Sequence, residues 1–133
     1  MRMDFDADNM CFACGAANAY GLQLTFSYDG EAYVTTFVAD PRFQGYDGIV
    51  HGGILATVLD EVMARYVWEK VGRAATAKLE VRYKRPAPTG QPITVLGWIT
   101  KERRAGRVFI TAALARLADG TVLAEATGIV MKI

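Results

Sequence analysis

The stretch from Gly48 to Lys70, "GIVHGGILATVLDEVMARYVWEK", decides the fold of this chain. It is the most hydrophobic segment of the sequence and is apolar almost all round, which is typical of a helix enclosed by the rest of the protein. The segment also holds the only histidine, His51, followed by two glycines. Two adjacent carboxylates, Asp60 and Glu61, lie in its middle. Because charged groups are costly to bury, we expect each of them to have a specific role.

The segments on both sides of this helix predict strands. Leu22 to Asp29 alternates apolar and polar residues, Asp29-Gly30 is a tight-turn signal, and residues 31–39 return. After the helix, four further strands are expected, separated by the loops "PAPTGQP", "KERRAGR" and "ADG". Hairpins of this kind build a mostly antiparallel sheet. The sequence therefore predicts an α+β fold, in which about six strands curl around one long central helix.

Length and composition limit the function classes. The chain of 133 residues suits a single domain over residues 1–133, and 15 basic residues oppose 14 acidic ones. A net charge of +1 gives no reason to expect nucleic acid or a membrane surface as a partner. The N-terminus has no long apolar run, so we expect no secretory signal. With two cysteines, a soluble cytoplasmic protein is expected.

The two adjacent carboxylates have different explanations. Thr57, Glu61, Arg65 and Glu69 recur every four residues and predict one polar stripe, on which Glu61 and Arg65 have a favourable spacing for an ion pair. Asp60 faces about 100° away from that stripe, among apolar neighbours. We therefore expect Glu61 to be structural and Asp60 to be chemical, with a raised pKa. The alternative is that Asp60 bonds a neighbouring strand.

His51 and the glycines after it predict an oxyanion site. The first N–H groups of a helix have no intrahelical partner, and glycine lets a substrate approach the Gly52 backbone closely. Alternatively, His51 is only a capping or loop residue. His51 and Asp60 are nine residues apart, or about 13 Å along a helix, so the two cannot contact one carbonyl from the same chain. A shared site would therefore combine two chains across a two-fold interface.

The motif "HGGILATVLDEVMA" resembles the signature of hotdog-fold acyl-CoA thioesterases of the phenylacetate (PaaI-like) type. "CFACGAANAYGLQLTF" is similar to the opening of many of these proteins, and the resemblance extends from Cys11 to Val130. It implies a homodimer, often paired into a tetramer, with two sites shared between chains. It implies that Asp60 is general base or nucleophile, that the Gly52 N–H polarises the thioester carbonyl, and that His51 orients the loop.

Two positions depart from the family pattern. Many relatives carry Asn or Gln six residues before the histidine, where this chain has Gly45, with Gln44 one residue earlier. Many also carry Ser or Thr four residues after the acid, where this chain has Ala64. Basic side chains near the end of the first strand after the helix are expected to form a solvated strand edge, and the alternative is that some of them bind the phosphates of CoA. The expected substrate-binding residues are Gln44, Gly45, Gly53, Arg82, Lys84 and Arg85.

Cys11 and Cys14 form a single Cys-x-x-Cys pair. With no second pair and one histidine elsewhere, we expect that a closed tetrahedral zinc site cannot be built within the chain, so buried thiols are expected, with a zinc site across a dimer as the alternative. We expect no cofactor and no metal. The predicted activity is acyl-CoA thioester hydrolysis. The alternatives are a non-catalytic acyl-CoA binding or sensing protein, and a hotdog dehydratase.

Overall fold

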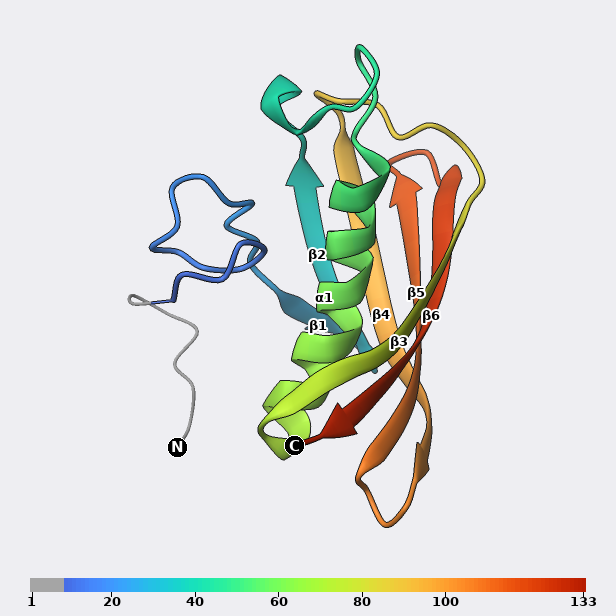
Figure 1. Ribbon diagram of the computed structural model, residues 1–133. Coiled ribbons are helices and arrows are strands. Elements are labelled where there is room, and N and C mark those ends of the chain that lie inside the picture. The colour runs from blue at the N-terminus through green and yellow to red at the C-terminus, as the bar shows by residue number, and fades with distance from the viewer. Residues whose placement is uncertain (1–8) are drawn as a thin grey trace.

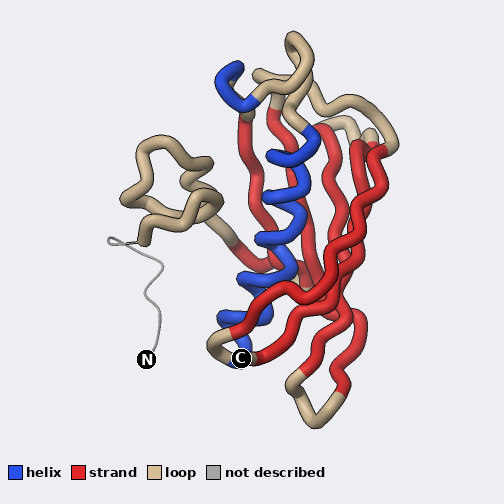
Figure 2. The backbone as a smooth tube through the Cα atoms, viewed as in Figure 1, coloured by secondary structure: helices blue, strands red, loops and turns tan. Residues whose placement is uncertain are grey.

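The computed structural model describes residues 9–133, in which a curled sheet surrounds one long helix (Figure 1). A 3-10 turn precedes the helix at Pro41–Phe43. Figure 2 shows that turn and the loop before the helix at one end of the sheet, and the hairpin loop of residues 104–107 at the other. The secondary-structure elements in chain order are β1 (Ser27–Asp29), β2 (Ala32–Val38), α1 (Gly52–Val71), β3 (Ala74–Tyr83), β4 (Pro92–Arg103), β5 (Val108–Leu117) and β6 (Val122–Lys132).

The six strands form one sheet in the order β1-β2-β4-β5-β6-β3, and every neighbouring pair is antiparallel. After β2 the chain leaves the sheet for α1 and re-enters at the edge opposite β1 as β3, and residues 84–91 then cross to β4, between β2 and β5. The helix then lies against the concave face, where it contacts β2 to β6. This is the hotdog arrangement, so the predicted fold is confirmed.

The helix is buried along most of its length, as its apolar sequence predicts. Five of its six buried side chains meet inward residues of the sheet in one core cluster, and Val67 packs in a second cluster with Ala74, Phe109 and Val130. Gly72 ends the helix at a φ of 91°, with its N–H donating to the Trp68 carbonyl. No helix within residues 9–133 is long and apolar enough to cross a membrane. The buried helical residues are Leu55, Val58, Leu59, Val62, Met63 and Val67.

The first predicted strand is shorter than expected. Only Ser27–Asp29 pairs with β2, although the alternation begins at Leu22. The backbone of Leu22 and Leu24 instead donates hydrogen bonds to the carbonyls of Phe12 and Ala13. Gln23, with a φ of 50°, interrupts the extended conformation between them. The alternation therefore reflects packing of Leu22 and Leu24 against the loop that contains Cys11 and Cys14, and not a longer strand.

Strand β3 contains a β-bulge that changes which side chains face the helix. Its pairing with β6 shifts between Thr76 and Lys78. Before the shift, Thr76 faces α1, and after it Val81 packs on the core and Tyr83 reaches the helix start. Strict alternation along this strand would place Ala77 on the same face as Val81 and Tyr83, but Ala77 is exposed. The extra residue of the bulge turns Ala77 outward and Thr76 inward.

Candidate active site

The start of α1 forms one half of the candidate site. His51 is the N-cap, and its Nδ1 accepts a hydrogen bond from the Gly53 N–H at 2.9 Å. The capping interpretation of His51 is therefore correct, and it is compatible with the role implied by the resemblance. Because Nδ1 is an acceptor here, a neutral His51 carries its proton on Nε2, which remains available as a donor.

The His51 side chain caps the Gly53 N–H and does not bind the Gly52 N–H. Gly52 is exposed and, within residues 9–133, its N–H has no hydrogen-bond acceptor. Its carbonyl accepts a hydrogen bond of 2.6 Å from the Tyr83 hydroxyl, which anchors the first helical turn to β3. An unpaired N–H at the positive end of a helix can stabilise negative charge on an oxygen. Tyr83 was not among the predicted site residues because nothing in the sequence pairs it with Gly52.

An open cleft of about 670 Å³ adjoins this helix start. It brings together five of the predicted residues, which come from the loop before the helix, the helix start and the end of β3. Aromatic and aliphatic side chains, including Tyr46, Ile49 and Leu55, line the rest of it. Such a mixture of apolar walls and few polar groups is typical of a small-molecule site. The five predicted residues in the cleft are Gly45, His51, Gly52, Lys84 and Arg85.

The remaining predicted binding residues lie elsewhere. Gln44 uses its side-chain oxygen to accept a hydrogen bond from the Gly48 N–H at 3.2 Å, so it shapes the loop before the helix. The Gly53 N–H is already bonded to His51. Arg82 lines a separate groove beside Trp98, away from His51. Of the two basic residues in the cleft, Lys84 Nζ lies 3.8 Å from Glu125 Oε2, whereas Arg85 has no ion-pair partner within the described residues.

Asp60 is the second half of the candidate site. It lies on α1 facing β3, where Thr76 Oγ1 donates a 2.7 Å hydrogen bond to its Oδ1. Burial raises the pKa of Asp60, and the hydrogen bond from Thr76 partly opposes that rise. The alternative of a bond to a neighbouring strand is thus correct in part: the partner is a side chain rather than the backbone. One Asp60 oxygen remains for other chemistry.

Glu61 differs from the prediction. Arg65 Nη2 lies 3.7 Å from Glu69 Oε1, and the Arg65 charge also acts on Glu61. The Glu61 carboxylate faces Cys11 and Cys14, and its Oε2 is buried without a hydrogen-bond partner among the described residues. Burial is the main cause that raises the pKa of Glu61, Asp60 adds to the rise, and the Arg65 charge acts to lower it. The segment before β1 covers Glu61, so the predicted polar stripe is not exposed to solvent along its whole length.

The two halves of the site are separate within one chain. Asp60 does not line the cleft that contains His51 and Gly52. This agrees with the separation of about 13 Å expected for nine residues of helix. What the fold and these two half-sites define is a hotdog protein with an unpaired N–H at its helix start and a half-buried carboxylate in the middle of the helix.

Comparison with known proteins identifies the family. The model of the thioesterase superfamily matches residues 47–122, which include both half-sites, so the chain belongs to that superfamily. The chain is 31% identical to acyl-coenzyme A thioesterase THEM4 of Mus musculus over 75% of its own length and 43% of the relative's. For THEM4 of Xenopus laevis the values are 32%, 75% and 45%. The chain thus spans less than half of these curated relatives.

Solved structures show the same fold. One thioesterase superfamily protein matches with a TM-score of 0.84 and 29% identity, over 93% of this chain and 61% of that one. The E. coli PaaI protein of the phenylacetic acid degradation operon matches with a TM-score of 0.73 and 17% identity, over 84% of each chain. The PaaI-like resemblance stated from the sequence is confirmed by these matches.

Proposed function

We propose that this chain is an acyl-CoA thioesterase that hydrolyses a thioester to a carboxylic acid and CoA. The observation that carries the proposal is the Gly52 N–H, which is unpaired at a helix N-terminus and borders an apolar cleft with a basic rim. The curated relatives named acyl-coenzyme A thioesterase support it. Structures of this fold with bound acetyl CoA or coenzyme A support CoA as the carrier.

In the proposed reaction, the Gly52 N–H of one chain donates to the thioester carbonyl oxygen. Asp60 of a second chain takes a proton from water, whose oxygen attacks the carbonyl carbon. The C–S bond then breaks, the acid is released, and the proton held by Asp60 passes to the CoA sulfur. Thr76 positions Asp60 through Oδ1, and Tyr83 positions the Gly52 carbonyl. Asp60 acting as nucleophile would lead to the same products.

A homodimer is part of this proposal, because His51 and Asp60 of one chain are too far apart to act together. Two copies related by a two-fold axis would form two sites, each with Gly52 from one chain and Asp60 from the other. A tetramer, a single domain over residues 1–133 and a cytoplasmic location stay predictions. Residues 1–8, on which the domain bounds and the absence of a secretory signal partly depend, lie outside the described residues.

The direct test is release of free thiol from acyl-CoA esters with short, long and aromatic acyl groups. We expect turnover of at least one of them by the purified protein. A Gly52→Pro variant, which lacks the proposed donor, serves as the control for trace contaminating thioesterase. Tight binding of acyl-CoA without thiol release would contradict the proposal and favour the non-catalytic binding function. Hydration of an enoyl-CoA would instead favour the dehydratase.

Arg85 is expected to bind a phosphate of CoA, because it borders the cleft and forms no ion pair within residues 9–133. Replacing Arg85 with Ala should raise KM for acyl-CoA about tenfold and leave kcat nearly unchanged, since ~1.4 kcal/mol corresponds to a tenfold change. Steady-state kinetics measures both constants. The matched control is Arg104→Ala at the β4–β5 hairpin, where the side chain is exposed and far from the cleft.

A second substrate separates phosphate binding from damage to the site. An acyl-pantetheine thioester lacks the nucleotide of CoA, so its KM should be insensitive to Arg85→Ala. If KM rises equally for both substrates, Arg85 acts on the shape of the cleft and not on a phosphate.

A further inference from the structure

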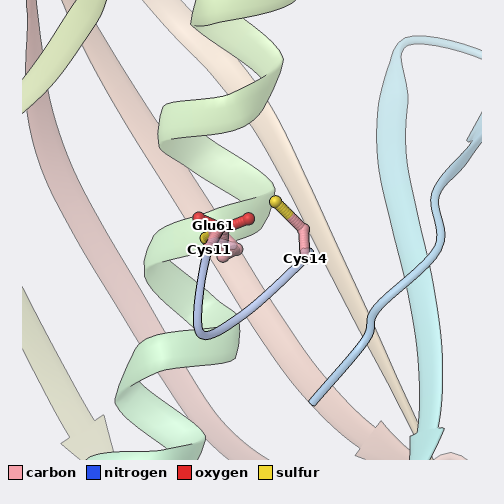
Figure 3. A group of neighbouring side chains, drawn as sticks. All are labelled: Cys11, Cys14 and Glu61. Atoms are coloured by element: carbon pink, nitrogen blue, oxygen red, sulfur yellow. The ribbon is translucent and has the colours of Figure 1, made fainter. Parts of the chain in front are cut away.

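The segment before β1 brings two thiols onto the helix beside a buried carboxylate. The Sγ atoms of Cys11 and Cys14 and a carboxylate oxygen of Glu61 all lie within 4.8 Å of one another. Figure 3 shows both sulfur atoms next to the Glu61 carboxylate, with the loop carrying the cysteines laid across α1. Cys14 is 4% exposed, whereas Cys11 is half-buried. The thioesterase reaction proposed above uses none of these three groups.

The loop that carries the cysteines is a tight turn with a fixed shape. Asn9 Oδ1 accepts a hydrogen bond from the Cys11 N–H, and the Cys11 carbonyl accepts one from the Gly15 N–H, both at 2.8 Å. A Cβ atom at Gly15 would lie within 2.6 Å of backbone atoms of Asn9 and Cys11, so this turn requires glycine directly after the second cysteine. The turn points both thiols toward the same carboxylate.

Without a cation, this cluster is electrostatically unfavourable. Glu61 Oε2 is buried and has no hydrogen-bond partner within residues 9–133. The Cys14 side chain is buried, and its Sγ lies within 4.8 Å of a Glu61 carboxylate oxygen. An unpaired buried polar atom costs roughly 1–3 kcal/mol, so native proteins seldom keep one without a reason. A cation between the sulfurs and the carboxylate would satisfy this atom.

We propose that Cys11, Cys14 and Glu61 bind one thiophilic divalent cation of the Zn²⁺ class. Two thiolates and one carboxylate oxygen provide three ligands, and a solvent molecule completes a tetrahedron. Metal–sulfur bonds of about 2.3 Å and metal–oxygen bonds of about 2.1 Å require ligand atoms roughly 3.5–3.8 Å apart. The cluster therefore needs a contraction of only about 1 Å from its present outer limit of 4.8 Å.

The protons of this site are accounted for, and the complex carries a net charge of −1, since two thiolates and one carboxylate oppose one divalent cation. Each thiol releases its proton to solvent when its sulfur binds the cation, and the Glu61 carboxylate binds in its ionised form. Asn9 Nδ2 lies 3.7 Å from Cys14 Sγ as a hydrogen-bond donor, which supports a thiolate there. The bound cation would join residues 9–15 to the middle of α1. Its role is therefore structural: it holds the N-terminal segment, including buried Ala13, against the core.

The test measures metal binding and does not depend on activity. Protein purified under reducing conditions, saturated with Zn²⁺ and dialysed, should contain one zinc per chain by elemental analysis. Titration of the metal-free protein with Co²⁺ should produce thiolate-to-cobalt charge-transfer absorption and the visible bands of a tetrahedral site. Glu61→Gln, Cys11→Ser and Cys14→Ser should each weaken zinc binding roughly 100-fold or more, because even outer-shell substitutions cost 10–100-fold.

The matched control is Asp60→Asn, which changes the adjacent carboxylate without touching the cluster. It should keep one zinc per chain and the cobalt spectrum of the wild type. The proposal is overturned if reduced wild-type protein binds neither metal stoichiometrically, or if Glu61→Gln binds both as tightly as wild type. It is also overturned if Cys11 and Cys14 form a disulfide in preference to the metal complex in zinc-containing reducing buffer. Circular dichroism identifies any variant that fails to fold, and Glu61→Gln, which alters no thiol, then decides.

Discussion

Replacing Asp60 with Asn is expected to lower kcat for thioester hydrolysis by roughly 10²–10⁴-fold, the usual contribution of a general base. The change is nearly isosteric and removes the group that would accept the water proton. Thr76 Oγ1 can still donate to the amide oxygen that replaces Oδ1, so the local hydrogen bond survives. Because burial disfavours charge at this position, a neutral side chain should not destabilise the fold.

Steady-state kinetics and thermal unfolding together check this prediction. The thermal midpoint of Asp60→Asn should equal or exceed that of the wild type. The control is Glu31→Gln, which removes the same charge at an exposed turn and should cost at most a few tenths of a kcal/mol. If Asp60→Asn retains most of the wild-type kcat, Asp60 is a structural carboxylate held by Thr76.

The second large effect is expected from mixing two inactive proteins. In Gly52→Pro the proposed oxyanion donor is absent, and loss of such a donor costs about 10²–10³-fold in kcat. Proline is favoured at the first position of a helix, which Gly52 occupies, and His51 has an extended ψ of 132° that suits a residue before proline. Gly52→Ala keeps the N–H and is the matched control, since its Cβ would meet Tyr83 at an ordinary 3.5 Å.

Subunit exchange between Gly52→Pro and Asp60→Asn should restore activity. In a heterodimer, one site combines the intact Gly52 of one chain with the intact Asp60 of the other, and the second site contains both lesions. A pure heterodimer should therefore reach about half of the wild-type rate per dimer. Each parent taken through the same exchange measures the background. Confirmed heterodimers that stay as inactive as their parents would show that Asp60 acts with groups of its own chain.

The sequence predicted the fold and the helix start well because those depend on local rules. Apolar periodicity located the central helix, turn signals located the hairpins, and two glycines after His51 predicted the free N–H at Gly52. The prediction that the first strand begins at Leu22 was wrong, because alternating apolar residues also suit a segment that packs against a loop. Those residues contact a segment more than eight positions away, which periodicity does not reveal.

The contacts of Asp60 and Glu61 could not be predicted from local sequence patterns. Asp60 meets Thr76 and Glu61 meets the cysteines through tertiary packing, across 16 residues of chain for the first pair. The sequence argument against a zinc site considered only cysteine and histidine as ligands. The carboxylate that completes the ligand set is 47 positions beyond Cys14 and was assigned to an exposed ion pair with Arg65. A helical wheel gives relative directions only, and what covers each face depends on the whole fold.

The bulge in β3 allows this one strand to contact both the start and the middle of the central helix. Thr76 supports Asp60 from before the irregularity and Tyr83 supports Gly52 from after it, so seven positions separate two side chains on one face. In a regular strand, an odd separation places two side chains on opposite faces. Deleting Ala77 would shorten this separation to six positions, the even spacing at which a regular strand without the bulge presents both side chains on one face. The number of residues between Thr76 and Tyr83 therefore determines whether the strand needs a bulge: seven positions require one, and six would not.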